Sequence, residues 1–249
     1  MKYLILQISL FFCVSMFTFS SISAQEITYL NKYKSPISDL NTYEPVYYNL
    51  ATIDQGKLVV KTYSMDSVLV SEKHTGYSID NKELVLYLAE YDKEGNLFHY
   101  QKMMGENKVF DQVFYDNKKI KYQKVLLGQE VLEASYFDEQ GQPRGEIVEE
   151  RPAPKGGLQG WNNYLMKNLR YPKDAKRKGE EGVAYLYFKI DEEGRMHDLD
   201  LMNPEDISPS LAEEALRVIG SYPYKWTPAK YDGKPVCEEV RLPLRFKIG

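Results

Sequence analysis

The side chains best suited to chemistry are few and widely separated along this 249-residue chain. Its three histidines, His74, His99 and His197, lie in separate runs and lack the close spacing of metal ligands carried on one element. Two cysteines are present, Cys13 and Cys237, and no histidine stands near Cys237 in sequence to act as its base. These residues predict neither a metal centre nor a thiol nucleophile.

Motifs that carry phosphate and acyl chemistry are also missing. The sequence has no G-x-S-x-G elbow, no P-loop and no dinucleotide-binding glycine pattern. The loop glycines Gly156-Gly157 and Gly160 lack the preceding strand that a phosphate-binding loop requires. Adjacent carboxylates, as in Glu180-Glu181, point apart on a strand or turn, so they cannot share a substrate. We therefore predict a protein that is not an enzyme and holds no cofactor.

The last part of the chain has the pattern of a small α+β domain. Apolar residues alternate over 184–190, which predicts a strand with one apolar face. Gly194 ends the following turn, so a second strand is expected to fold back as a hairpin. Apolar residues recur at helical spacing over 208–220, and they alternate with polar residues again over 240–248. The predicted order is strand, strand, helix, strand, with one sheet face packed on the helix.

The order of short motifs in this region resembles the carboxyl-terminal domain of the TonB family, periplasmic energy transducers of Gram-negative bacteria. The resemblance covers roughly the last two fifths of the chain and rests on core and turn positions. Those positions include Tyr171, Pro172, Gly182, Gly194, Trp226, Pro228, Gly233 and Pro235.

The resemblance implies that the domain binds extended peptide segments of outer-membrane TonB-dependent transporters. It also implies strand addition, in which backbone groups of an open sheet edge pair with the incoming segment. The expected edge is the last strand, residues 239–248, where Pro243 marks an edge or a bulge because it has no N–H. Its cations could pair with acidic side chains of the partner. The outward face carries Glu239, Arg241, Pro243, Arg245 and Lys247.

Residues 1–24 have the pattern of a secretory signal. Lys2 precedes an apolar run over 4–19, and small residues over 21–24 supply a cleavage site. The chain is then expected in the periplasm. The alternative is an uncleaved membrane anchor facing the periplasm, since the apolar run approaches the about 20 residues that span a bilayer.

An anchored chain would be a transducer that contacts the ExbB–ExbD motor, as the family resemblance implies. The family's transducers have a histidine in that helix and a long proline-rich spacer. Residues 1–24 contain no histidine, and residues 151–157 form only a short hinge. A further alternative is an envelope assembly adaptor that contacts no transporter. The net charge of -4 argues against nucleic acid as a partner.

The middle of the chain predicts a β-rich region that resembles MORN-like hairpin repeats. Tyr91-Asp92, Tyr115-Asp116 and Phe137-Asp138 recur at spacings of 24 and 22 residues, each between an alternating run and a turn. Its many tyrosines either fill the sheet's own core or form a partner-binding surface. Candidate strands are residues 56–63, 84–91, 109–115 and 119–127. The predicted domains are a signal at 1–24, the β-rich repeats at 25–150 and the TonB-like domain at 151–249.

Overall fold

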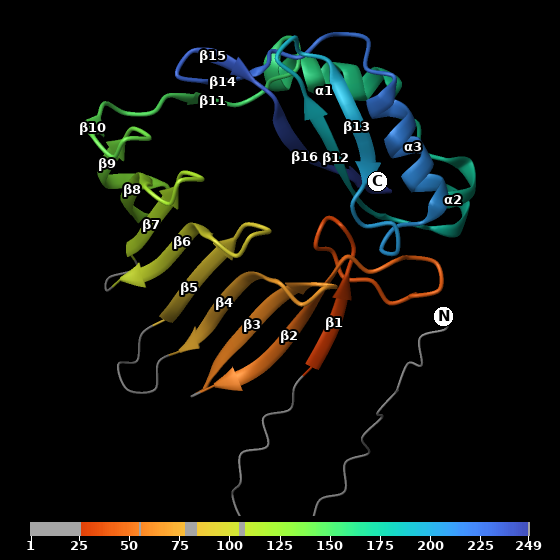
Figure 1. The fold of residues 1–249 in the computed structure, drawn as a ribbon. Helices are drawn as coiled ribbons and strands as arrows, with labels where there is room; N and C mark the ends of the chain where they lie inside the picture. Colours follow the sequence, from red (N-terminus) through yellow and green to blue (C-terminus); the bar gives the residue numbers. More distant parts are fainter. Residues whose placement is uncertain (1–25, 55, 78–83, 105–107, 249) are drawn as a thin grey trace, which may run out of the picture.

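The computed structural model describes residues 26–54, 56–77, 84–104 and 108–248. The secretory signal predicted at 1–24 lies outside these described residues. The predicted α+β fold is confirmed, because a ten-stranded antiparallel sheet precedes a smaller domain of helices and strands (Figure 1).

The amino-terminal region is one continuous meander in which neighbours in sequence are neighbours in the sheet. The four predicted strands correspond to β3, β5, β7 and β8, each within one residue of its predicted ends. The other strands have no purely apolar face, so alternation alone did not reveal them. The bounds are β1 Glu26–Leu30, β2 Tyr47–Asp54, β3 Lys57–Ser64, β4 Leu69–Tyr77, β5 Leu84–Tyr91, β6 Leu97–Met104, β7 Lys108–Phe114, β8 Ile120–Leu127, β9 Glu130–Phe137 and β10 Pro143–Arg144.

The recurring aromatic–Asp pairs mark hairpin turns, as their spacing predicts. After β5, the Asp92 carboxylate accepts the N–H of Asn96 at 2.7 Å, and Gly95 takes a positive φ of 80°. After β9, the Asp138 carboxylate accepts the N–H of Gln142 at 2.8 Å. Each aspartate thus satisfies a turn N–H that the ladder leaves unpaired.

This sheet is a single layer with little apolar core. Among its described residues, the buried hydrophobic side chains from β1 to β10 are Leu30, Ile37, Val59 and Ala89. Half-buried rings pack across neighbouring strands instead, as Tyr87 does against His74 and Tyr100, with centroids 4.8 and 5.6 Å apart. Cross-strand pairs of this kind each contribute roughly 0.2–1 kcal/mol. These tyrosines therefore pack on their own sheet.

The carboxyl-terminal domain has a three-stranded sheet in the order β13-β12-β16 and a separate strand group in the order β11-β14-β15. The predicted order of strand, strand, helix and strand is present, with two further helices and a short hairpin added. The loop predicted at Gly156-Gly157 and Gly160 is instead the start of α1. The bounds are β11 Glu149–Glu150, α1 Gly157–Asn168, α2 Lys173–Lys178, β12 Gly182–Ile190, β13 Met196–Leu201, α3 Pro209–Gly220, β14 Ala229–Tyr231, β15 Lys234–Val236 and β16 Glu238–Phe246.

One face of the β13-β12-β16 sheet packs on helix α3 and forms the main core of the molecule. Trp226 covers one end of this core, with its ring centroid 5.3 Å from Phe188 and 5.6 Å from Trp161. Burial of each large apolar side chain contributes about 1.5–3 kcal/mol, so this domain has the stronger apolar core. The largest fully buried side chains are Leu186, Phe188 and Ile190 of β12 with Leu211, Val218 and Ile219 of α3.

The predicted hinge at 151–157 is fixed to the carboxyl-terminal domain. Ala153 exchanges two backbone hydrogen bonds with Thr227, at 2.7 and 3.0 Å. The N–H of Lys155 donates to the hydroxyl of Tyr222 at 3.0 Å. The segment is therefore part of the carboxyl-terminal domain and not a free linker. Its prolines favour extended backbone, and here the extended backbone forms an isolated β-bridge with Thr227.

The opposite end of the amino-terminal sheet is also bonded to the carboxyl-terminal domain, through residues 31–39, here called the amino-terminal loop. Asn31 donates its side-chain N–H to the carbonyl of Met202 at 2.8 Å. The N–H of Ser38 donates to the Glu205 carboxylate at 2.7 Å. The small domain therefore lies beside both ends of the large sheet, as Figure 1 shows.

Candidate partner-binding edge

Strand β16 is an edge of the three-stranded sheet, since it pairs with β12 alone (Figure 1). Its register with β12 runs without a bulge from Gly182–Phe246 to Ile190–Glu238. The strand ends at Phe246, two residues before the predicted end. Beyond it, the N–H of Ile248 donates to the Glu181 carboxylate at 2.7 Å. Of the two interpretations of Pro243, an edge strand rather than a bulge holds.

The backbone direction of β16 follows from the bonds of β12. Tyr185 donates its N–H to the side chain of Asn203 at 2.9 Å, and its carbonyl accepts the N–H of Met202 at 2.8 Å. Both backbone groups of Tyr185 thus point toward β13 and away from β16. Tyr185 lies opposite Pro243, so these two residues form a non-hydrogen-bonded pair. The backbone groups of Pro243 consequently face the open edge.

Residues two positions apart in a strand direct their backbone groups to the same side. Glu239, Arg241 and Arg245 therefore present N–H and C=O groups to the open edge together with the carbonyl of Pro243. Pro243 removes one donor from this free row and none from the ladder with β12. Proline at such a position hinders uncontrolled edge-to-edge pairing and leaves bonding groups on either side of it.

The outward side chains of β16 carry surplus positive charge. Glu239, Arg241, Pro243, Arg245 and Lys247 are all exposed, although Lys247 lies just after the strand. Glu239 accepts a hydrogen bond from the hydroxyl of Tyr187 at 2.8 Å. Within the described part of the chain, the ion pairs include none for Arg241, Arg245 or Lys247. Three cations are thus available on this face.

Two of the predicted motif glycines lie in turns for different physical reasons. Gly194 has a φ of 78°, and a Cβ added there would lie 2.1 Å from the carbonyl oxygen of Trp226. The N–H of Trp226 donates to the carbonyl of Gly194 at 2.9 Å, so this close approach fixes the tryptophan. Gly233 has the same φ of 78° in the turn between β14 and β15, with no atom within 4 Å of an added Cβ.

The remaining motif residues lie away from the outward face of β16. Tyr171 packs against the ring of Phe246 with centroids 5.8 Å apart, and its hydroxyl donates to the carbonyl of Glu180. Pro172 precedes α2, Gly182 begins β12, Pro228 precedes β14, and Pro235 lies in β15.

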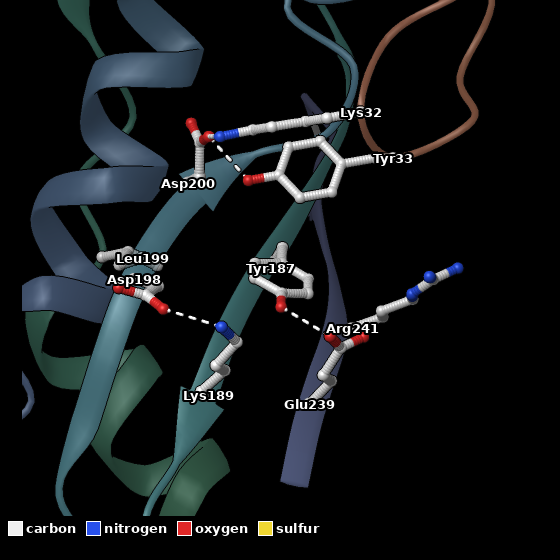
Figure 2. A pocket seen from close by; sticks show the side chains of 9 residues that line it. All are labelled: Lys32, Tyr33, Tyr187, Lys189, Asp198, Leu199, Asp200, Glu239 and Arg241. Carbon is white, nitrogen blue, oxygen red and sulfur yellow. Dashed lines mark hydrogen bonds and ion pairs between the residues drawn. The ribbon is translucent and has the colours of Figure 1, made fainter. Parts of the chain in front are cut away.

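A hollow of about 510 Å³ lies where the amino-terminal loop meets the polar face of the three-stranded sheet (Figure 2). Sequence reasoning anticipated Glu239 and Arg241 but missed Tyr33, which is 167 residues from its partner Asp200. No local pattern marks such a pair. The lining residues are Lys32, Tyr33, Tyr187, Lys189, Asp198, Leu199, Asp200, Glu239 and Arg241.

The loop side of this hollow is held by one carboxylate. Asp200 accepts the hydroxyl of Tyr33 at 2.6 Å and pairs with the Lys32 ammonium at 2.7 Å. Burial alone would raise the pKa of Asp200, but these two partners keep it below its usual range. Burial, and then the bond to Asp200, raise the pKa of Tyr33 to about 12. Asp200 is therefore ionised and Tyr33 protonated at neutral pH.

None of the histidines lies on β16, whereas Cys237 directly precedes this strand. His197 contacts the Asp191 carboxylate at 2.8 Å, and Cys237 is an exposed free thiol. Across the described ranges, no three His, Cys, Asp or Glu side chains gather closely enough to hold a metal ion. No helix in that part of the chain is long and apolar enough to cross a membrane.

The fold and the edge together define a class: a small, helix-covered antiparallel sheet with an open, positively charged edge strand. Residues 167–248 match the model of the family described as Gram-negative bacterial TonB protein C-terminal. Protein TonB of Vibrio cholerae serotype O1 is 30% identical over 79 residues, which are 32% of this chain and 31% of that protein. The chain thus spans about a third of that relative's length. No solved structure gives a significant match. Residues 167–248 are thus similar to the TonB carboxyl-terminal domain.

Proposed function

We propose that this protein is a non-enzymatic periplasmic binding protein whose carboxyl-terminal domain captures extended segments of outer-membrane TonB-dependent transporters. The segment adds to β16 as a further strand and so supports transport across the outer membrane. The open row of backbone groups on β16 carries this proposal, and the match of residues 167–248 to the TonB carboxyl-terminal family model supports the class of partner.

The geometry of β16 indicates how the segment is held. Backbone bonds form at Glu239 and Arg241 on one side of Pro243, and at Arg245 on the other. The absent N–H at Pro243 divides this row, so the affinity is modest. Backbone pairing supplies binding energy that does not depend on sequence, whereas the outward side chains select among segments.

The proposed location depends on removal of residues 1–24, which would leave β-rich repeats at 25–150 and the TonB-like domain at 151–249. Amino-terminal sequencing of the exported protein tests it, with a first residue of Gln25 expected. A chain that keeps Met1 would instead be anchored in the inner membrane, where contact with ExbB–ExbD becomes the better hypothesis.

Strand addition is tested by a pull-down of outer-membrane proteins with the full chain and its Arg241→Pro variant. The substitution removes a second N–H from the open edge, so capture of transporters is expected to fall below detection. Arg241→Ala is the matched control, because it removes the charge but keeps the N–H, and it should retain part of the capture.

Circular dichroism establishes that both variants are folded before the comparison is made. If folded Arg241→Pro captures the same transporters as the wild type, binding does not run along β16. An envelope adaptor without transporter contact would then be the better description.

A further inference from the structure

The last long strand of the ten-stranded sheet has an open edge of its own (Figure 1). Strand β9 pairs with β8 along most of its length, whereas β10 pairs only with Tyr136 and Phe137 on the other side. Residues 130–135 of β9 are all exposed, and no described strand pairs with them on that side. At the opposite end of the sheet the amino-terminal loop bonds to β1, since the N–H of Ile37 donates to the carbonyl of Tyr29 at 2.9 Å.

The hairpin between β9 and β10 fixes the direction of the free backbone groups. The N–H of Asp138 donates to the carbonyl of Gln142 at 3.0 Å. Hydrogen-bonded pairs recur at every second position of an antiparallel ladder, so Tyr136 and Arg144 form the next one. The backbone groups of Tyr136 therefore point away from β8. Ala134, two residues earlier, directs its N–H and C=O to the same side, which is the open edge.

This edge has few of the features that hinder strand pairing. Strand β16 contains Pro243, whereas residues 130–135 contain neither proline nor lysine. Their protection is limited to a register shift that leaves Leu132 without a partner in β8. Val131 and Leu132 are 50% and 40% exposed. The edge therefore presents both backbone hydrogen-bonding groups and apolar side chains to an added strand.

One face of this edge is negatively charged. Glu130 lies opposite Leu127, and Glu133 lies opposite Val125. Because these two β8 residues are two positions apart, both carboxylates lie on the same face of the sheet. Within the described part of the chain, no ion pair involves either glutamate. The neighbouring cation Lys124 lies on the other face, where its ammonium is over two tyrosine rings.

We propose that β9 is a second strand-acceptor edge, which binds a cationic extended segment of a partner protein. The segment adds beside residues 130–135 and bonds to the backbone of Ala134. Its lysine or arginine side chains alternate with apolar ones, so that cations lie beside Glu130 and Glu133 while apolar side chains cover Val131. This site does not depend on the function proposed for β16. Because the two edges belong to different sheets, the chain can hold one segment at each.

The test uses the full chain in its Arg241→Pro form, so that β16 contributes little to binding, and two synthetic peptides. In one peptide lysine alternates with valine and threonine, and in the other glutamate replaces lysine. Fluorescence anisotropy measures the affinity of each. We expect the lysine peptide to bind more tightly than the glutamate peptide, and Glu130→Lys with Glu133→Lys to reverse this order.

Removal of the edge donor separates strand addition from charge attraction. Ala134→Pro should weaken binding of the lysine peptide about tenfold, because an edge hydrogen bond is lost. Ala134→Val is the matched control, since it keeps the N–H and should bind as before. Circular dichroism establishes that both variants are folded.

Two results would overturn the proposed edge. The first is equal affinity of folded Ala134→Pro and Ala134→Val for the lysine peptide, and the second is an order of peptide affinities that charge reversal leaves unchanged. Sedimentation velocity without peptide examines another occupant. Self-association that Ala134→Pro abolishes would assign β9 to a second copy of the chain and overturn the cationic partner.

Discussion

The two regions of this molecule reach an ordered structure by different means. In the carboxyl-terminal domain, helix and sheet enclose a core whose largest side chains are fully buried, Phe188 and Leu211 among them. In the amino-terminal sheet, ordered backbone ladders continue through ten strands with almost no side chain removed completely from water. The carboxyl-terminal domain depends on apolar burial. The amino-terminal sheet depends on ladder bonds, cross-strand ring contacts and polar contacts to the carboxyl-terminal domain.

This difference has a consequence for how the site is built. A single-layer sheet has two solvated faces, so its side chains bury little apolar area. The compact domain contributes the strand edge, which must be rigid to present backbone groups at fixed spacing. We expect substitutions to act strongly in the compact domain and weakly in the sheet and its junctions.

The largest effect is expected for Trp226→Ala. Trp226 is 6% exposed and packs on Phe188 and Trp161, so truncation should lower the free energy of unfolding by about 3–5 kcal/mol. Denaturant unfolding followed by circular dichroism measures the change. The control is Tyr185→Ala in β12, because Tyr185 is 48% exposed and its truncation should cost less than about 1 kcal/mol. Equal costs would refute the helix-on-sheet core.

A matched pair of glycines sharpens the same point. Gly233→Ala should cost about 1–2 kcal/mol, because it forces a residue with a Cβ into a left-handed conformation. Gly194→Ala has the same φ and also places a Cβ against the Trp226 carbonyl, which adds about 1–3 kcal/mol. Thermal unfolding compares the two variants. If they melt together, the close approach at Gly194 does not constrain the domain.

The amino-terminal sheet should instead respond to pH. Hydrogen bonds to Asp111 and then Glu90 raise the pKa of His99 from 6.5 to about 9. A pKa raised in the folded state gives stability that is complete below pH 6.5 and lost as the pH rises through 9. Denaturant midpoints of the sheet should therefore fall across this window. In His99→Gln the fall should disappear, and an unchanged pH profile in that variant would exclude His99 as its source.

The smallest effect is expected at the junction of the two regions. Asp200→Asn weakens the contacts to Tyr33 and Lys32, and because Asp200 is partly exposed the cost should be only about 0.5–1 kcal/mol. Hydrogen exchange of the amino-terminal loop should rise. Asp198→Asn is the control, since Asp198 pairs with Lys189 inside the compact domain. Equal exchange in both variants would mean that Asp200 does not hold the loop.

The sequence by itself determined the local elements of the carboxyl-terminal domain. The alternation of apolar residues over β12 and β16 and their helical spacing in α3 indicate which face of each element is buried. Gly194 marks the turn between β12 and β13. Because Pro243 has no N–H, the sequence alone predicted that this strand is either an edge strand or bulged. The same reasoning located β5, whose ends were predicted correctly.

The tertiary structure alone decided which segments meet. Tyr33 and Asp200 are 167 residues apart, and nothing in either local sequence names the other. The hinge expected at 151–157 is a bonded segment because Thr227 lies beside Ala153. Likewise, Tyr33 and Arg241 line one hollow only because the amino-terminal loop packs on the domain at the other end of the chain. Periodicity fixes the faces of an element, whereas the contacts between distant elements depend on how the whole chain packs.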